Sequence, residues 1–238
     1  MTEGYLIEMD YGYLDRNVAE IRQRIKAAAD TSDYRKDVTL VAAVKYAEVG
    51  EIKYLYESVG VRDLGENRVQ QLLEHYEAID DGNVNWHFIG TLQTNKVKYI
   101  IDKVCMIHSV DSVKLAREID RQAEKHGKIM DVLVEINSGE EESKSGALPS
   151  EAAALCEEIC QLEHVRVRGF MTMAPKCEEK SDYLKFFRQT YAQVLDIWTK
   201  TMHNIGEPVL SMGMSESFEE AIACGADTVR VGRSLFVK

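Results

Sequence analysis

Lys45 is the leading candidate for a chemical role, because it ends a mainly apolar stretch, VTLVAAVK, at residues 38–45. A run with apolar residues at both odd and even positions predicts a strand buried on both faces, as in a parallel sheet covered by helices. A lysine at the carboxyl end of such a strand either extends its amine to solvent or holds it for a reaction. Burial would keep the amine neutral and nucleophilic toward carbonyl compounds. The residue alone leaves both interpretations open.

Two glycine-bearing segments near the end of the sequence are suited to binding an anion. Residues 213–215, Gly-Met-Ser, precede a predicted helix, where backbone amides and the hydroxyl of Ser215 could bind phosphate. Gly232 follows a predicted strand, and its missing side chain lets an anion approach the backbone. Ser215 could instead be only a helix cap, and Gly232 only a turn residue. Arg230 is costly to bury alone, so we expect it to contact either an acidic side chain or a ligand.

The pattern of strands and helices brings these residues to one end of a barrel. It predicts eight strands, each followed by a helix or a helix start, after an amphipathic helix at residues 11–29. We therefore predict a single (β/α)8 TIM barrel domain spanning residues 1–238, in which residues 1–37 form an extra N-terminal helix that packs on the barrel. An open doubly wound sheet is the alternative. The predicted strands are 38–45, 61–64, 83–90, 104–110, 129–137, 165–171, 208–212 and 227–231, and the predicted helices between them are 48–59, 68–79, 92–101, 112–126, 151–163, 182–203 and 215–223.

In such a barrel, functional groups gather at the carboxyl ends of the strands, and the loops after strands seven and eight frequently bind phosphate. Lys45 ends strand one, while Ser215 and Gly232 follow strands seven and eight. We therefore expect the amine to face a phosphate site across the barrel mouth. A phosphorylated aldehyde held as a Schiff base fits both features, and pyridoxal phosphate is the ligand of this kind that we predict.

Composition excludes several other classes of function. The net charge of −11, with no basic patch, argues against binding to nucleic acid. Five cysteines at irregular positions indicate a reduced protein without a disulfide framework. Cys156 and Cys160 are one helical turn apart, but neither has a neighbouring histidine at ligand spacing, and we predict no metal site. The N-terminus lacks an apolar targeting segment, and no apolar run reaches about 18 residues, so we predict a soluble cytoplasmic protein without a membrane partner.

Motifs along most of the sequence resemble those of the pyridoxal phosphate homeostasis proteins, also called PROSC or YggS-like proteins. They follow the family's order from about residue 38 onward, and HFIGxLQxNK and SMGMS are the specific ones. The matching segments are LVAAVKY at 40–46, LGEN at 64–67, WHFIGTLQTNK at 86–96, GEEESKSG at 139–146, RGFMTM at 168–173, LSMGMSESFEEAI at 210–222 and VRVGRSLF at 229–236.

The resemblance implies a barrel like the N-terminal domain of alanine racemase, with pyridoxal phosphate attached to Lys45. It also implies that Arg230 faces the pyridine nitrogen of the cofactor. A second positive charge beside a guanidinium is disfavoured, so that nitrogen would stay unprotonated and the ring would be a poorer electron sink. The resemblance assigns no residue a catalytic role.

The same resemblance assigns the remaining cofactor contacts. Ser215, Gly232 and Arg233 would hold the phosphate, and Asn67 would line the pocket near the ring. A histidine on a strand is more often a satisfied core residue than a ligand-binding one. The two weaker candidates are His87 and Met212.

Two departures from the family's pattern affect these assignments. Val44 stands where the family often has a serine, and residues 47–50 lack the usual proline, so the loop after strand one could have a different shape. Arg233 and Ser234 stand where a smaller residue commonly follows the glycine. The added guanidinium would either strengthen phosphate binding or cap the pocket.

The resemblance implies a protein that stores, delivers or buffers pyridoxal phosphate, with pyridoxal-phosphate-dependent apoenzymes as recipients, and that is a monomer or a weak dimer. An amino-acid racemase is the alternative. It needs an acid–base group on each face of the substrate, and the second one comes in alanine racemase from an additional domain that we expect to be absent. Losing one such group costs about 10²- to 10⁴-fold in rate. A Schiff-base aldolase acting on a sugar phosphate would use the same lysine, but no motif supports it.

The polar loop at residues 138–149 is either functional or a solvated turn.

Overall fold

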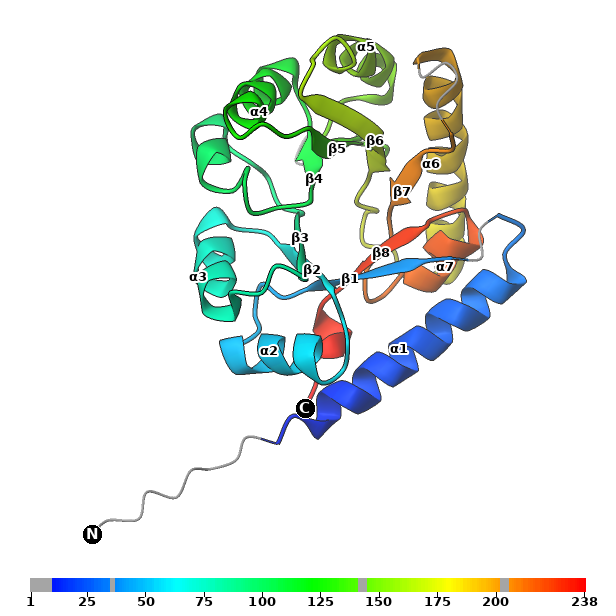
Figure 1. The fold of residues 1–238 in the computed structure, drawn as a ribbon. Helices are drawn as coiled ribbons and strands as arrows, with labels where there is room; N and C mark the ends of the chain where they lie inside the picture. The colour runs from blue at the N-terminus through cyan, green and yellow to red at the C-terminus, as the bar shows by residue number, and fades with distance from the viewer. Residues whose placement is uncertain (1–9, 35–36, 141–144, 202–205) are drawn as a thin grey trace.

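Eight parallel strands form a closed barrel in the computed structural model, which describes residues 10–34, 37–140, 145–201 and 206–238. Each strand pairs with its neighbours in chain order, and the eighth pairs with the first (Figure 1). The predicted (β/α)8 barrel with an N-terminal helix is confirmed, and the open doubly wound sheet is excluded because its first and last strands would not pair. The strands are β1 (Thr39–Ala43), β2 (Asp63–Glu66), β3 (Asn85–Phe88), β4 (Met106–Val110), β5 (Met130–Glu135), β6 (Val165–Met171), β7 (Val209–Ser211) and β8 (Thr228–Val231).

Most connections contain the helix that the sequence predicts. The exception follows β3, where the 3-10 helix η1 (Thr94–Tyr99) replaces the predicted helix at residues 92–101. Thr94 and Asn95 compete with helical hydrogen bonding, and short connectors often adopt the tighter 3-10 geometry. None of the helices in the described ranges is long and apolar enough to cross a membrane. The helices are α1 (Gly12–Thr31), α2 (Val49–Glu57), α3 (Val69–Ile79), α4 (Val113–Lys125), α5 (Pro149–Ile159), α6 (Lys180–Thr201), α7 (Phe218–Ala223) and the 3-10 helix η2 (Arg233–Leu235); the predicted end of the sixth helix, His203, lies outside the described residues.

Helix α1 lies beside α7, η2 and α2, where the helix after β8 would otherwise complete the outer ring (Figure 1). Its buried side chains recur at steps of three and four residues, from Leu14 to Ile25, so one face is apolar and packs on the barrel. The side chain of Asn17 donates to the carbonyl oxygens of Leu235, at 2.9 Å, and Val237, at 2.8 Å. Helix α1 therefore also holds the segment that follows β8.

The alignment between strands determines which side chains point into the barrel. Val41 of β1 is aligned with Arg230 of β8, and Ser211 of β7 is aligned with Thr228 of β8. Side chains alternate along a strand, and aligned residues of a parallel pair point the same way. Since Arg230 bonds to Ser211 inside the barrel, this set faces the interior, whereas Val229 packs outward against the helices. The interior near the carboxyl ends of β7 and β8 is therefore polar.

The loop at residues 138–149 is described only in part. The backbone amide of Ala147 donates to the carbonyl oxygen of Glu135 at 2.8 Å, and Ser145 Oγ lies 3.4 Å from Thr91 Oγ1. The end of this loop therefore returns to β5 and to the segment after β3. Glu141, Glu142 and Lys144, part of its predicted acidic turn and rim, lie outside the described residues.

Candidate functional site

Lys45 lies two residues beyond the end of β1, at the mouth of the barrel. Val41 and Ala43 occupy inward-facing positions of β1, and Lys45 follows at the same spacing of two residues, whereas Val44 is fully buried among apolar side chains. The backbone oxygen of Lys45 accepts a hydrogen bond from the side chain of Gln71 at 2.9 Å. Its side chain is half-buried, with Nζ 4.9 Å from the centre of the Tyr46 ring. The amine is therefore neither sealed in the core nor paired with a carboxylate among the described residues.

The loops that follow β7 and β8 converge on one oxygen atom. Ser215 Oγ accepts hydrogen bonds from the backbone amides of Gly232 and Ser234, each at 3.4 Å. Both bonds are long for an amide donor and therefore weak. Two backbone amides therefore point at one acceptor oxygen. An oxygen atom of a bound anion accepts from converging amides in the same way at such loops.

Gly232 places the loop after β8 directly beside β1. A Cβ atom on Gly232 would lie 3.0 Å from the carbonyl oxygen of Ala43 and 3.3 Å from its Cβ. A side chain there would press against β1 two residues before Lys45, so the missing side chain permits the close approach. The sequence led us to expect the amine and the anion loop on opposite sides of the mouth. They lie on neighbouring strands instead, because closure of the barrel pairs β8 with β1.

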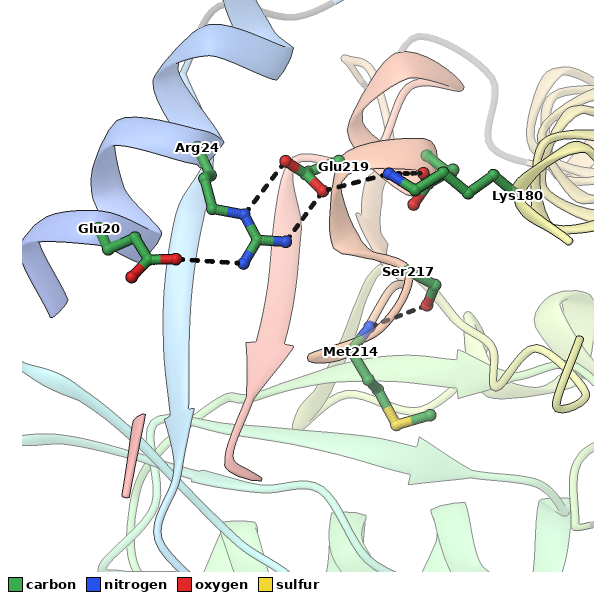
Figure 2. A network of polar contacts seen from close by, with 7 residues as sticks. Glu20, Arg24, Lys180, Met214, Ser217 and Glu219 are labelled. Carbon is green, nitrogen blue, oxygen red and sulfur yellow. Dashed lines mark hydrogen bonds and ion pairs between the residues drawn. The ribbon is translucent and has the colours of Figure 1, made fainter. Parts of the chain in front are cut away.

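The prediction that a helix begins at Ser215 is wrong. Residues 215–217 form a turn, and α7 begins at Phe218. The backbone amide of Met214 donates to Ser217 Oγ at 3.3 Å, so Ser217 closes this turn (Figure 2). Two serines stand near the helix start, and residue preferences alone do not decide between them. Ser215 is thereby left to contact the loop after β8.

A network of charged side chains anchors the short helix α7 behind this turn (Figure 2). Arg24 of α1 donates to Glu219 of α7 twice, from Nε at 3.2 Å and from Nη2 at 2.9 Å. Lys180 of α6 pairs with Glu220 at 3.2 Å and with Glu219 at 3.9 Å. The guanidinium of Arg24 also lies 4.7 Å above the Phe218 ring. Helices α1 and α6 thus hold α7 in place.

Arg230 is buried, and its contacts are neutral oxygen atoms. Its Nη1 donates to the carbonyl oxygen and to the hydroxyl of Ser211, both at 2.7 Å, and its Nη2 donates to the carbonyl oxygen of Thr172 at 2.9 Å. Burial lowers the pKa of Arg230 to about 10, and the charge of Glu135 opposes this shift. In the part of the chain that the structure describes, Arg230 forms no ion pair, so the acid partner considered at the sequence level is not found. Its positive charge is not neutralised by direct contact.

Three other predicted residues lie near the mouth or behind it. The backbone amide of Asn67 donates to Glu66 Oε2 at 3.2 Å, and the side of Asn67 toward η1 borders an open groove of about 500 Å³. Met212 is buried and borders a small cavity under α6. The side chain of Arg233 is 75% exposed, and its guanidinium pairs with Glu216 at 3.0 Å. By direct contact, the structure brings together Ser215, Gly232 and β1, but not the side chains of Asn67, Met212 or Arg233.

The surroundings of Ser234 indicate whether the residues of this loop fit a phosphate group. Its Oγ is enclosed and has no hydrogen-bond partner among the described residues, although its backbone amide points at Ser215. A buried hydroxyl without a partner costs about 1–3 kcal/mol, which an anion oxygen accepting from it would recover. The donor set of two amides and a hydroxyl fits a phosphate. No cluster of three metal-ligating side chains occurs within the described ranges.

Sequence reasoning missed three residues of this site. Ser234 was noted only as an unusual neighbour of Gly232, and Ser211 and Glu135 were not singled out. The inward alternation of β5 and β7 could have identified both, because a polar residue at an inward position near the strand end faces the barrel mouth. Burial raises the pKa of Glu135 to about 7, Asp111 adds to this shift, and Arg230 opposes it.

A closed barrel with an amine just after β1, beside the loop that follows β8, defines a class of protein, and the comparisons identify it. The family model described as "Alanine racemase, N-terminal domain" matches residues 14–238, and the chain belongs to this family. Its fold is similar to that of alanine racemase from Clostridium difficile 630, with a TM-score of 0.74 at 19% identity over 95% of this chain and 57% of that one.

Within the family, this chain is one of the pyridoxal phosphate homeostasis proteins. It is 39% identical over 219 residues to the "Pyridoxal phosphate homeostasis protein" of Aquifex aeolicus, covering 92% of this chain and 95% of the relative. It is 34% identical over 221 residues to the protein of the same name from Pseudomonas aeruginosa, covering 92% and 93% of the two chains. The structure of PipY from Synechococcus elongatus PCC7942 with PLP bound has a TM-score of 0.82 and 29% identity, over 94% of this chain and all of that one.

Proposed function

We propose that this protein binds pyridoxal phosphate (PLP) in the cytoplasm and takes part in its homeostasis, as a single barrel domain with the cofactor held as a Schiff base on Lys45. One observation carries the proposal: the amides of Gly232 and Ser234 converge on Ser215 Oγ, and Gly232 packs on Ala43, two residues before the lysine. An amine and a phosphate site on neighbouring strands match the aldehyde and the phosphate of one small molecule. The names of the relatives and the PLP-bound structure of PipY support it.

Each predicted site residue then has a physical role. Ser215, the amide of Gly232 and the backbone of Arg233 at the start of η2 bind the phosphate, while the Arg233 guanidinium pairs outward with Glu216. The unneutralised charge of Arg230 faces the pyridine nitrogen and disfavours a proton there. When bound, PLP supplies an electrophilic aldehyde and an electron-accepting ring. The remaining members of the predicted pocket are Asn67, beside the ring, and Met212, the first residue after β7.

We further propose that the protein exchanges the cofactor with apoenzymes rather than turning over a substrate. Its recipients would be PLP-dependent enzymes, and it would act as a monomer or a weak dimer. The loaded protein, mixed with a PLP-dependent apoenzyme and a scavenger of free PLP, should restore the enzyme's activity. The same mixture with the two proteins separated by a dialysis membrane should not. Racemisation of alanine or serine at ordinary enzyme rates would instead establish the racemase alternative.

The attachment site can be tested directly. The purified protein should be yellow, and reduction with borohydride should add the mass of the reduced cofactor to the peptide that contains Lys45. Lys45→Ala should be colourless. Lys53→Ala is the matched control, because Lys53 is exposed on α2, eight positions further along, and should leave colour and labelling unchanged. A cofactor found on a different lysine, with Lys45 unmodified, would eliminate the assignment.

A further inference from the structure

A chain of hydrogen bonds crosses the inside of the barrel from the first residue of β2 to Arg230. His87 Nε2 lies 3.1 Å from Asp63 Oδ1, and His87 Nδ1 lies 3.0 Å from His108 Nε2. His108 Nδ1 lies 3.1 Å from Ser211 Oγ, and that oxygen lies 2.7 Å from Arg230 Nη1. His108 and Ser211 have no exposed surface. The chain thus joins the amino end of the barrel to the proposed cofactor site at its carboxyl end.

As long as His108 is uncharged, as its depressed pKa indicates, donor and acceptor chemistry permits two proton arrangements along this chain. Arg230 can only donate, so Ser211 Oγ accepts from it. If His87 carries two ring protons, it donates to Asp63 and to His108, and the neutral ring of His108 then donates from Nδ1 to Ser211. If His87 is neutral and donates only to Asp63, His108 must carry its proton on Nε2 and accept the hydroxyl proton of Ser211. The proton on His87 therefore determines the direction of the bond between His108 and Ser211.

The surroundings favour the first arrangement at neutral pH. Burial opposes a charge on His87, but its contacts with Asp63 and with Cys105 Sγ, 3.6 Å away, outweigh burial and raise its pKa to about 9. Burial, together with the charges of His87 and Arg230, holds the pKa of His108 well below its usual range. His87 is then a cation and His108 a neutral donor to Ser211.

We infer that His108 is a positioning residue for Arg230, acting through Ser211, and that Asp63 maintains the proton arrangement on which this positioning depends. When His108 donates, Ser211 Oγ accepts hydrogen bonds from both His108 and Arg230. The hydroxyl proton of Ser211 then takes no part in this chain of hydrogen bonds. Arg230 is held by both oxygens of Ser211 and by the carbonyl oxygen of Thr172. These bonds fix the plane of the guanidinium and leave its other N–H groups for a ligand. Only the identity of that ligand rests on the proposed function.

The other charged groups nearby do not offer Arg230 a second anchor. Glu135 interacts with Arg230 electrostatically but, among the described residues, forms no ion pair with it. Asp111 interacts with Glu135 and raises the pKa of that carboxyl further. The position of the guanidinium therefore depends on Ser211 and Thr172, and the hydrogen bond from His108 sets the state of Ser211.

The proton arrangement can be measured in the ligand-free protein by NMR of isotope-labelled histidine. At pH 7 we expect His87 to be protonated on both nitrogens and His108 on Nδ1. Asp63→Asn should lower the titration midpoint of His87 by about one pH unit or more, and His108 should move its proton to Nε2 above that midpoint. Asp63 is partly exposed, so this variant disturbs packing little.

A matched control comes from the same end of the barrel. Asp131 of β5 pairs with Arg166 at 2.6 Å and does not contact the chain of hydrogen bonds, so Asp131→Asn should leave both rings unchanged. A wild-type His108 protonated on Nε2 at pH 7 overturns the inference. The inference is also overturned if His87 responds to Asp63→Asn and His108 does not.

A second measurement uses protein loaded with PLP and reports on Arg230. His108→Leu should shift the visible absorption band of the bound cofactor and its pH dependence, whereas His108→Gln, whose amide can donate to Ser211, should restore both. An unchanged band in His108→Leu, with the cofactor still on Lys45, contradicts the positioning role. If the wild-type protein binds no PLP, the proposed function fails, and the histidine measurement on the ligand-free protein still decides the inference.

Discussion

Arg24 and Arg230 show two uses of the same side chain in one molecule. Arg24, on the outside of the barrel, makes two hydrogen bonds to the carboxylate of Glu219, and this contact raises its pKa (Figure 2). Arg230, inside the barrel, donates to carbonyl and hydroxyl oxygens and has no carboxylate partner in the described part of the chain, and burial lowers its pKa to about 10. The first charge is neutralised by its partner, while the second is not.

The difference separates an arginine that stabilises the fold from one that is available to a ligand. A paired and partly exposed arginine contributes little to the free energy of unfolding, since surface ion pairs contribute about 0–1 kcal/mol. A buried guanidinium held by neutral oxygens retains a cost that an electron-rich ligand can offset. We therefore expect substitutions of the two residues to affect different measurements.

Arg230→Met should produce the largest effect, and it should be on ligand binding. Removing a hydrogen bond from a charged donor costs about 1.5–3 kcal/mol, so PLP affinity should fall roughly 10- to 100-fold, with a shifted absorption band. Arg24→Met is the control and should leave both unchanged. Affinity can be measured by absorbance titration of the ligand-free protein. Equal losses of affinity in the two variants would remove the distinction between the arginines.

Glu135 sharpens the comparison, because it is the acid whose charge acts on Arg230 and yet it does not pair with it among the described residues. Its pKa rises from 4.5 to about 7 on folding, mainly through burial. Between these two values the folded protein binds a proton that the unfolded chain does not, so stability falls as pH rises from 4.5 to 7 and then stays level. Glu135→Gln should abolish this loss and gain roughly 3 kcal/mol relative to wild type between pH 4.5 and 8.

Urea unfolding across this pH range measures the effect of Glu135→Gln. The difference between variant and wild type isolates Glu135, because His87 contributes equally to both proteins. Glu157→Gln, an exposed position on α5, serves as the control and should leave the pH profile as in wild type. If the free energy of unfolding of Glu135→Gln changed with pH in parallel with that of wild type, the Glu135 carboxyl would be ionised in the folded protein. Its negative charge would then balance the positive charge of Arg230.

The sequence predicted the scaffold and the ends of its strands better than the contacts inside it. Local periodicity identifies a buried strand at residues 38–45, and position at a strand end then selects Lys45 and Gly232, because every parallel strand delivers its carboxyl end to the same face. The chain of hydrogen bonds from Asp63 to Ser211 could not be found this way, since its members lie on separate strands and meet only after closure. The choice between Ser215 and Ser217 as the turn residue likewise depends on contacts with the loop after β8 that local rules do not contain.

The smallest expected effect belongs to the pair outside the barrel. Arg24→Met should lower the free energy of unfolding by about 1 kcal/mol, since the pair with Glu219 is bidentate but partly exposed. Most of this loss should vanish in 1 M salt, where screening acts over about 3 Å. Lys26→Met, which removes an exposed pair with Asp30 on the same helix, should leave the free energy of unfolding nearly unchanged. If Arg24→Met also weakened PLP binding, the hold of α1 on α7 would extend to the loop of Ser215, and the two arginines would belong to one site.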